Sequence, residues 1–299
     1  MVSVVIPTYN RAHFLERAVQ SVLSQSHAAV EVVVIDDGSE DSTPELLARM
    51  AVRHPAGILN CRRIAHSGVS RARNQGIACS RGEWICFLDS DDYWLPRKLE
   101  RQLAYLSRNP GYRVCHTDEV WIRNGVRINP GRKHRKWEGW FFEPSLQLCL
   151  ISPSTVMLHR SVLEEVGGFD ESFPVVEDYE LWLRVTARYP VGYLYEKLVV
   201  KTGGHPDQLS ASIEAIEKYR LRALEKVMTS GCLSPAFFRT AREVYRKKAL
   251  IYLQGCLKRG KQGEAERMRR ALGRFAPEET ARPPGGQDGI PPLHDEVRA

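Results

Sequence analysis

The sequence begins with a repeated pattern of a short apolar run and a helical stretch, and this pattern restricts the fold more than any other feature. Residues 2–6 form a β-branched run, and residues 12–25 then place apolar side chains at helical spacing. Similar apolar runs at residues 30–35 and 83–88 lie next to further helical stretches. Nearly continuous apolar runs are typical of strands that are buried on both faces. The alternation therefore predicts an α/β fold with a parallel sheet covered by helices.

Acidic residues follow two of these predicted strands directly. Asp36-Asp37-Gly38-Ser39 comes after the second strand, and Asp89-Ser90-Asp91-Asp92 comes after the third. In open α/β sheets, ligands bind beyond the carboxyl ends of the parallel strands. We therefore expect both acidic turns to lie at one binding site.

The carboxylates of Asp89, Asp91 and Asp92 would repel one another at the end of a buried strand. A divalent cation is the simplest neutralising partner, and oxygen ligands favour Mg²⁺ or Mn²⁺ with positions left open for phosphate oxygens. The residues alone leave one alternative open, in which Asp91 or Asp92 caps the helix predicted after Leu95-Pro96.

Three further groups of residues allow both a functional and a structural interpretation. Asp37 could accept the ring N–H of a nucleobase such as uracil, or it could simply form a turn. An arginine in Ser70-Arg71-Ala72-Arg73-Asn74 could reach a phosphate or a carboxylate, or remain solvated. Glu177-Asp178 precedes a predicted helix, where a carboxylate could act as a general base or cap the helix.

Six motifs in order along the chain carry a resemblance to a known family. They are PTYNR at 7–11, VVIDDGSEDST at 33–43, ARNQG at 72–76, FLDSDDYW at 87–94, VGGFDESF at 166–173 and EDYELWLR at 177–184. In this combination the sequence resembles glycosyltransferase family 2 over residues 1–210.

The resemblance implies a GT-A fold, which is a Rossmann-like, mostly parallel central sheet flanked by helices. We expect residues 1–210 to form the catalytic domain, with a nucleotide-binding half at 1–95 and an acceptor-binding half at 96–210. Helical spacing predicts a basic C-terminal helical extension over residues 211–275. Residues 276–299, rich in Pro, Gly and charge, are expected to be disordered.

The resemblance also implies roles for single residues. The nucleotide-sugar would be held by Pro7, Thr8, Tyr9, Asp37, Arg73, Asp89 and Ser90, with Asp89 near the ribose. Asp91 matches the metal-binding aspartate that bridges the cation to the donor diphosphate. His205, in the stretch GGHPDQLS, is a further candidate contact for the metal or the diphosphate. Asp178 matches the catalytic base.

The implied reaction is a single displacement with inversion, in which Mn²⁺ or Mg²⁺ assists transfer of a sugar from a nucleotide diphosphate-sugar to an acceptor hydroxyl. A UDP-sugar is the expected donor, with guanosine and thymidine as the other nucleosides. The expected acceptor is a saccharide or lipid-linked saccharide in surface polysaccharide or glycolipid synthesis. The chain lacks the Q-x-x-R-W pattern of processive family members, which favours addition of one or a few sugars.

Other classes of protein fit less well. A dehydrogenase would need a G-x-G-x-x-G turn after the first strand, which is absent. A specific nucleic-acid-binding protein is disfavoured because the acidic strand ends would repel phosphate. A non-catalytic sugar-nucleotide-binding protein and a sugar-nucleotide pyrophosphorylase remain as alternatives.

Positive charge is concentrated near the end of the chain. Residues 234–275 hold twelve Lys or Arg and three Asp or Glu, a local net charge of +9 against +7 for the whole chain. This segment predicts either peripheral contact with an anionic membrane or a solvated helical hairpin. A second basic segment, residues 123–140, carries Trp137 and Trp140 and predicts a mobile acceptor-binding loop or an ordinary charged loop.

Cysteine usage and hydropathy bear on localisation. The seven cysteines are scattered without a C-x-x-C pair, which indicates reduced structural thiols. The sequence shows no basic leader at its start and no apolar run near the roughly 20 residues that span a bilayer. We expect a cytoplasmic protein that can contact the inner face of the membrane peripherally.

Overall fold

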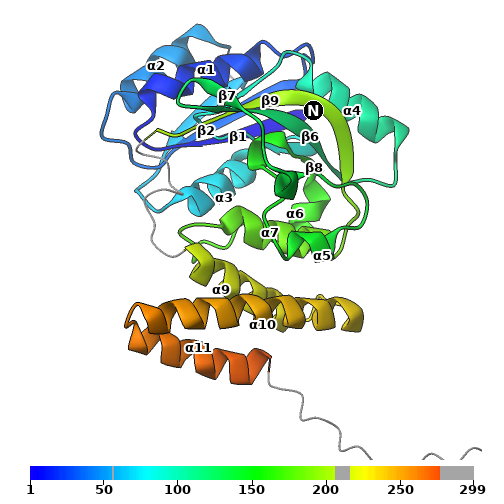
Figure 1. Ribbon diagram of the computed structural model, residues 1–299. Coiled ribbons are helices and arrows are strands. Elements are labelled where there is room, and N and C mark those ends of the chain that lie inside the picture. The colour runs from blue at the N-terminus through cyan, green and yellow to red at the C-terminus, as the bar shows by residue number, and fades with distance from the viewer. Residues whose placement is uncertain (56, 206–215, 277–299) are drawn as a thin grey trace, which may run out of the picture.

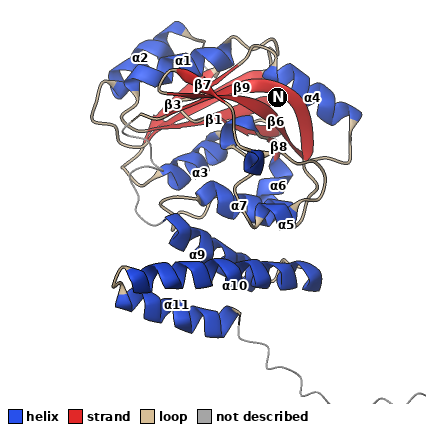
Figure 2. Cartoon of the chain, viewed as in Figure 1, coloured by secondary structure: helices blue, strands red, loops and turns tan. Residues whose placement is uncertain are grey.

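A computed structural model describes residues 1–55, 57–205 and 216–276. Its core is a curled β-sheet with helices on both faces, and three further helices lie beneath this α/β body (Figure 1, Figure 2). The strands are β1 (Val2–Thr8), β2 (Val30–Asp36), β3 (Leu59–Arg63), β4 (Trp84–Phe87), β5 (Tyr93–Trp94), β6 (Val114–Arg123), β7 (Val126–Ile128), β8 (Met157–His159) and β9 (Gly192–Gly203). The helices of the body are α1 (Ala12–Leu23), α2 (Thr43–Arg53), α3 (Val69–Cys79), α4 (Lys98–Arg108), α5 (Phe142–Ser145), α6 (Arg160–Val166) and α7 (Glu177–Thr186), with short 3₁₀ turns at Arg132–His134 and Pro153–Thr155.

Nine strands of the described residues form one sheet in the order β3-β2-β1-β4-β8-β6-β9-β5, with β7 paired to β6. The first half of this sheet is parallel, as the alternation of strands and helices predicts: β1 lies between β2 and β4. The second half adds antiparallel pairs through β8 and β5, while β6 and β9 run parallel. The parallel half brings the carboxyl ends of β1, β2 and β4 to one edge.

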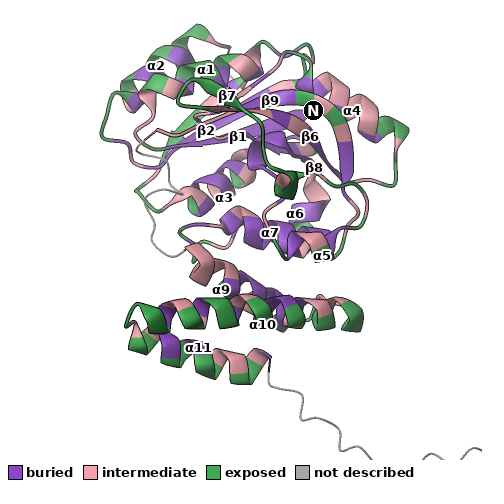
Figure 3. Cartoon of the chain, in the orientation of Figure 1, coloured by how far each residue is buried: buried purple, intermediate pink, exposed green. Residues whose placement is uncertain are grey.

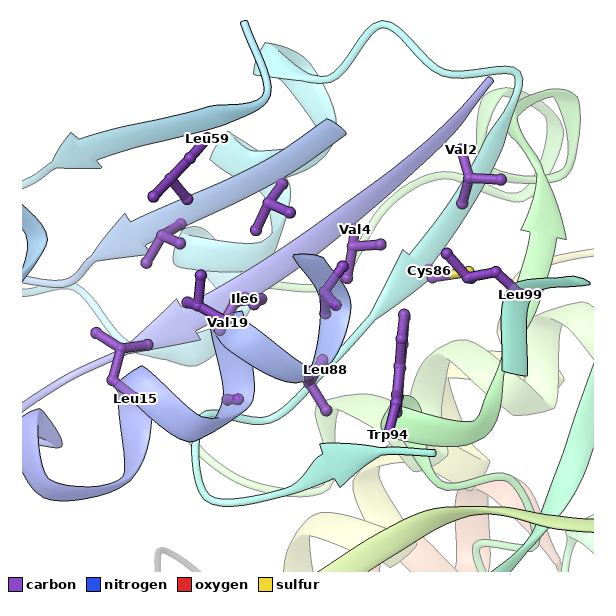
Figure 4. Close-up of a cluster of buried hydrophobic side chains, with 14 of the residues drawn as sticks. Val2, Val4, Ile6, Leu15, Val19, Leu59, Cys86, Leu88, Trp94 and Leu99 are labelled. Atoms are coloured by element: carbon purple, nitrogen blue, oxygen red, sulfur yellow. The ribbon is translucent and has the colours of Figure 1, made fainter. Parts of the chain in front are cut away.

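Alternation along β1 assigns its side chains to two different cores. Val4 and Ile6 pack in a cluster with α1, α2 and α4 (Figure 4). Val5 points to the opposite face and packs in a cluster with α6 and α7. On this second face Gly76 of α3 sits directly over β1, since a Cβ built there would lie 2.2 Å from a Val5 methyl. The sheet is thus buried on both faces, which explains its nearly continuous apolar strands.

Several strands were not indicated by the residue pattern, among them β3 and β9. β3 lies at the sheet edge, and most of its side chains are exposed or half-buried, including Arg62 and Arg63. β9 mixes buried and exposed side chains irregularly, because its pairing with β6 shifts register near Asp118. Neither strand shows the clean apolar run or strict alternation on which the other predictions depend.

The predicted C-terminal extension contains α9 (Ile216–Thr229), α10 (Pro235–Lys258) and α11 (Gln262–Phe275). It shares one apolar cluster with the body, in which Tyr179 and Leu183 of α7 pack with Leu221 and Leu224 of α9. The predicted disordered tail, apart from the buried Ala276, lies outside the described residues, as does the segment from Pro206 to Ser210. Among the helices that the structure describes, none is long and apolar enough to cross a membrane.

Candidate active site

A cavity of about 1110 Å³ opens at the carboxyl ends of the parallel strands. Every site residue predicted from the sequence except His205 lines it: Pro7, Thr8, Tyr9, Asp37, Arg73, Asp89, Ser90, Asp91 and Asp178. The loops after β1, β2 and β4 therefore converge as the strand pattern predicts, and the first turn of α7 faces the same space.

The aspartates of the acidic turn after β4 have different partners and different roles. Asp92 is fully buried, and its carboxylate accepts hydrogen bonds from the Ser154 hydroxyl at 2.6 Å and the Thr202 amide at 2.9 Å. Burial and the neighbouring carboxylates of Asp91 and Asp89 raise the pKa of Asp92. The first residue flanking α4 is Arg97, without a side-chain cap, so the helix-cap alternative for Asp91 or Asp92 is wrong. Asp92 instead fastens the turn to β9.

Asp91 and His205 form the part of the site best suited to a cation. The Asp91 Oδ2 and His205 Nε2 atoms lie 2.8 Å apart, and Arg11 Nη1 lies 3.4 Å from His205 Nδ1. Octahedral ligation at about 2.1 Å separates neighbouring ligands by about 3 Å, so both atoms could bind one ion. Burial and the nearby Asp89 raise the pKa of Asp91, which means that its charged form is disfavoured. A bound cation would stabilise that charged form.

The protein would supply only part of such a metal site. Among residues 1–55, 57–205 and 216–276, no cluster of three or more His, Cys, Asp or Glu side chains is arranged to hold a metal. Mg²⁺ commonly binds through one or two protein ligands together with phosphate and water. The residues present fit a cation that arrives with a diphosphate.

Arg73 links the acidic turn to α7. Its guanidinium is buried and donates to Asp89 Oδ1 at 2.7 Å and to Glu177 Oε1 at 2.5 Å. Although burial opposes the charge, the two carboxylates raise the pKa of Arg73, so it stays cationic. Arg71, the other arginine of this motif, is exposed, so Arg73 is the arginine of the motif that reaches the carboxylates of the site. Arg73 fixes the strand-end aspartates relative to the first turn of α7.

The first turn of α7 is held in an unusual backbone conformation. Val176, which precedes it, has φ of +58°, a region that β-branched residues rarely adopt. Such outliers concentrate at functional sites. Glu177 points to Arg73, and burial raises the pKa of Glu177 to about 7 against the lowering effect of Arg73. Asp178 faces the cavity, where its Oδ2 accepts from the Cys149 thiol at 3.4 Å.

The turn after β2 lies beside an aromatic platform that the segments after β1 and β3 provide. Asp37 accepts from the amides of Ser67 and Gly68, each at 2.8 Å, and its Oδ2 lies 3.0 Å from His66 Nδ1. The His66 ring stacks on Tyr9 with centroids 4.1 Å apart. Asp37 Oδ1 accepts one hydrogen bond from the protein and can accept a second one. The stacked rings of Tyr9 and His66 offer a flat face for a planar base. His66 was not predicted, since a histidine in a loop gives no spacing signal.

A second group of cavity residues that the sequence did not predict lies on β6, on β9 and in the loop after β7. Glu119 of β6 accepts from Lys136 Nζ at 3.0 Å, from Trp121 Nε1 at 2.9 Å and from the Ser152 hydroxyl at 3.0 Å. Burial raises the pKa of Glu119, but Lys136 and Lys201 outweigh burial and bring it down to about 2. Lys136 and Lys201 both line the cavity. Burial opposes the charge of Lys201, but the carboxylates of Glu119, Asp92, Asp89 and Asp178 outweigh burial and raise the pKa of Lys201.

The two tryptophans proposed to stack on the acceptor do not line the cavity. Trp137 and Trp140 are 44% and 61% exposed, on the outside of the loop. The loop instead turns Lys136 inward to Glu119, and the tryptophan that lines the cavity is Trp121. The buried carboxylate on β6, which no local pattern reveals, determines which residue of the loop points inward.

Comparison with known proteins gives a consistent result. The model of glycosyl transferase family 2 matches residues 3–167. An uncharacterized glycosyltransferase of Rickettsia bellii is 32% identical over 203 residues, which are 66% of this chain and 28% of that protein. The Escherichia coli enzyme UDP-Glc:alpha-D-GlcNAc-diphosphoundecaprenol beta-1,3-glucosyltransferase WfaP is 29% identical over 195 residues, 63% of this chain and 71% of that protein.

Solved structures confirm the predicted GT-A fold. S. aureus TarS residues 1–349 in complex with UDP-GlcNAc matches with a TM-score of 0.73 at 19% identity, covering 92% of this chain and 80% of that chain. The mannosyltransferase PcManGT from Pyrobaculum calidifontis, in complex with GDP-Man and Mn²⁺, matches with a TM-score of 0.57 at 19% identity, covering 92% and 81%. The strand order and both helical layers therefore belong to a known architecture.

Proposed function

Because the chain belongs to glycosyl transferase family 2, we propose that it transfers a sugar from a nucleotide diphosphate-sugar to an acceptor hydroxyl with inversion. The observation that carries the proposal is the single cavity that holds Asp37, Asp91 and Asp178 together. A base-binding platform, a site for a diphosphate with its cation and a carboxylate base are the three parts that such a reaction requires.

A UDP-sugar is the proposed donor. The free lone pair of Asp37 suits the ring N–H of uracil, and Tyr9 with His66 would stack on the base. Asp89 and Ser90 follow β4 at the same edge and would lie along the ribose and phosphates. TarS in complex with UDP-GlcNAc and the UDP-Glc donor in the name of WfaP support the assignment.

Asp91, with His205 as a second ligand, would hold Mn²⁺ or Mg²⁺. When bound, the ion neutralises the diphosphate leaving group. His205 Nε2 faces the Asp91 carboxylate, which only accepts, and Nδ1 faces the Arg11 guanidinium, which only donates, so the ring proton is on Nε2. Binding a metal through Nε2 would require the tautomer with the proton on Nδ1. PcManGT, with GDP-Man and Mn²⁺, supports a metal.

Asp178 would act as the base toward the acceptor hydroxyl. Removing the hydroxyl proton as the oxygen attacks the anomeric carbon gives one displacement, and one displacement inverts that carbon. Glu177 also lines the cavity but is paired with Arg73, which leaves Asp178 as the carboxylate of the two that could take the acceptor proton. The bond from Arg73 to Glu177 fixes the turn relative to the donor residues.

A lipid-linked saccharide is the proposed acceptor, in synthesis of a surface polysaccharide or glycolipid. The name of WfaP specifies an acceptor attached to diphosphoundecaprenol, which supports this class. Lys136 and Lys201 line the cavity and could contact the anionic part of such an acceptor.

The test is a screen of UDP-, GDP- and dTDP-sugars with Mn²⁺, Mg²⁺ or EDTA, using wild type and Asp91→Asn. We expect metal-dependent release of UDP that Asp91→Asn abolishes. Tight nucleotide binding without turnover on any acceptor would favour a non-catalytic sugar-nucleotide-binding protein. Release of pyrophosphate from a nucleotide triphosphate and a sugar phosphate would indicate a pyrophosphorylase. No nucleotide binding in the presence of metal would contradict the proposal.

We also propose peripheral membrane contact through the basic extension. One side of α10 is exposed along much of its length (Figure 3). Its exposed residues include Leu250, Ile251 and Leu257 together with Lys247 and Lys258. Apolar side chains framed by cations suit the surface of an anionic bilayer.

The test of this contact is sedimentation with vesicles of phosphatidylglycerol and phosphatidylcholine, using wild type and Leu250→Ser/Ile251→Ser. We expect wild type to bind in proportion to the anionic lipid and the double variant to lose most binding. Equal binding of the two proteins would contradict a role for this face, and dimerisation through it would appear in sedimentation velocity without vesicles.

A further inference from the structure

The first turns of α9 contribute to the wall of the active-site cavity. Ile216 and Arg220 of α9 line the cavity together with Asp178 and Tyr179 of α7. Burial raises the pKa of the Tyr179 hydroxyl and the Arg220 charge opposes this, so the guanidinium lies near that hydroxyl. The helical extension is therefore part of the site, and its cation lies on the side of the proposed base.

Arg220 has donor capacity that its protein neighbours do not use. Its Nη1 donates to Glu217 Oε2 at 3.2 Å, whereas its Nε, although buried, has no hydrogen-bond partner among the described residues. Glu217 is shared with Lys248, whose Nζ lies 3.3 Å from the other carboxylate oxygen. Two cations around one carboxylate leave a net positive charge, and a buried N–H without a partner is costly unless a ligand accepts from it.

The neighbouring wall is apolar. Leu148, Leu150, Ile151 and Ile216 line the cavity with Arg220. An apolar wall beside an arginine fits a ligand that has both a hydrocarbon part and an anionic group. A saccharide without a lipid-linked diphosphate would offer neither.

The α9 helix is fixed against the body, so the position of Arg220 is set by packing. Lys226 Nζ lies 2.8 Å from both Asp170 and Glu180, and Arg222 donates to the Ser172 hydroxyl at 2.6 Å. These contacts join α9 to the loop that leads into α7. An arginine presented from such a rigid element can contribute to specificity.

We propose that Arg220 binds the diphosphate of a lipid-linked acceptor, with the lipid beginning along the apolar wall. The inference rests on the proposed function and refines it by assigning a C-terminal helix to acceptor recognition. Arginine binds phosphate oxygens through paired N–H groups, which the unsatisfied Nε and the Nη groups can supply.

The kinetic test uses the full chain with one saccharide presented on a lipid diphosphate and as a simple alkyl glycoside. We expect Arg220→Ala to raise KM for the diphosphate-linked acceptor about tenfold or more, with KM for the glycoside and for the UDP-sugar unchanged. Arg220→Lys should recover part of the loss, because lysine keeps the positive charge but lacks the paired N–H donors of the guanidinium. Arg239→Ala, which removes an exposed arginine of α10 that does not line the cavity, is the matched control.

Three kinetic outcomes would overturn the inference: equal losses with both acceptors, a raised KM for the donor instead, or no change in any constant. The donor outcome would reassign Arg220 to the donor diphosphate.

A binding measurement separates this inference from the proposed reaction. With UDP and Mn²⁺ saturating the donor side, farnesyl diphosphate is titrated into wild type and Arg220→Ala by calorimetry. We expect wild type to bind it, and Arg220→Ala to bind at least tenfold more weakly, even if no sugar transfer is detected. Equal binding by the two proteins, or no binding by wild type, would contradict the acceptor site and leave the transferase proposal to its own test.

Discussion

The donor side and the acceptor side of the cavity are built by different means. On the donor side, Thr8, Asp37 and Asp91 stand at or just after the ends of neighbouring strands, so the backbone of the sheet sets their spacing. On the acceptor side, Lys136 and Arg220 come from a loop and an added helix, and only packing brings both to the cavity. A rigid donor side with a separately built acceptor side lets one reaction serve different acceptors, because loops and appended helices can change without disturbing the sheet.

The strongest test of this division is Asp178→Asn. The amide keeps the shape of the side chain but cannot take a proton, so we expect the transfer rate to fall by about 10²- to 10⁴-fold. The affinity for UDP with metal should stay within about twofold, because Asp178 belongs to the acceptor side. Single-turnover rates and titration calorimetry measure the two quantities. A comparable loss of UDP affinity would show that the two sides are not separable at α7.

The next largest effect is expected from Glu119→Gln. The substitution leaves the cations of Lys136 and Lys201 near a neutral amide in a buried wall, which costs on the order of 3 kcal/mol of stability. Urea unfolding measures the loss. Glu266→Gln, an exposed change on α11, should alter stability by less than about 0.5 kcal/mol. Equal stabilities of the two variants would mean that water already screens the pair.

The same residue gives a pH prediction with a defined sign. The pKa of Glu119 is lowered from 4.5 to about 2 in the folded protein, so its contribution is complete above about pH 4.5 and is lost as pH falls toward 2. Wild type should therefore lose more stability than Glu119→Gln across this window. Unfolding midpoints at several pH values between 5 and 2 test it. Parallel pH profiles for the two proteins would assign acid sensitivity to other carboxylates.

The contrast between the two sides also explains what could be predicted from the sequence. The parallel half of the sheet and the residues at its strand ends follow from apolar runs and short local motifs. Glu119 and Arg220 could not be found in this way, because the cavity that they line is assembled from distant segments and their own neighbourhoods resemble an ordinary strand and an ordinary helix. The Asp92 carboxylate was expected to bind a cation or cap a helix, but its partners Ser154 and Thr202 are known only once the 3₁₀ turn at Pro153–Thr155 and β9 are placed.

A smaller effect is expected on the donor side from His66→Ala and Tyr9→Ala. Loss of one stacking ring should weaken UDP affinity about tenfold, since base stacking on an aromatic side chain contributes about 1 to 3 kcal/mol. The rate at saturating donor should change little. Calorimetry with UDP gives the affinity, and Tyr195→Ala, an exposed ring on β9, is the control. An unchanged affinity in both site variants would place the base elsewhere in the cavity.

The smallest effect is expected from Trp137→Ala and Trp140→Ala, the two substitutions that the sequence alone would rank as important for the acceptor. Both rings lie outside the cavity, so acceptor KM should change by less than about twofold and stability by less than about 0.5 kcal/mol. Trp121→Ala should raise acceptor KM more, because Trp121 lines the cavity and its indole N–H donates to Glu119. If Trp137→Ala or Trp140→Ala raised acceptor KM more than Trp121→Ala, the loop would have to close over the bound acceptor. The acceptor side would then depend on a loop movement as well as on packing.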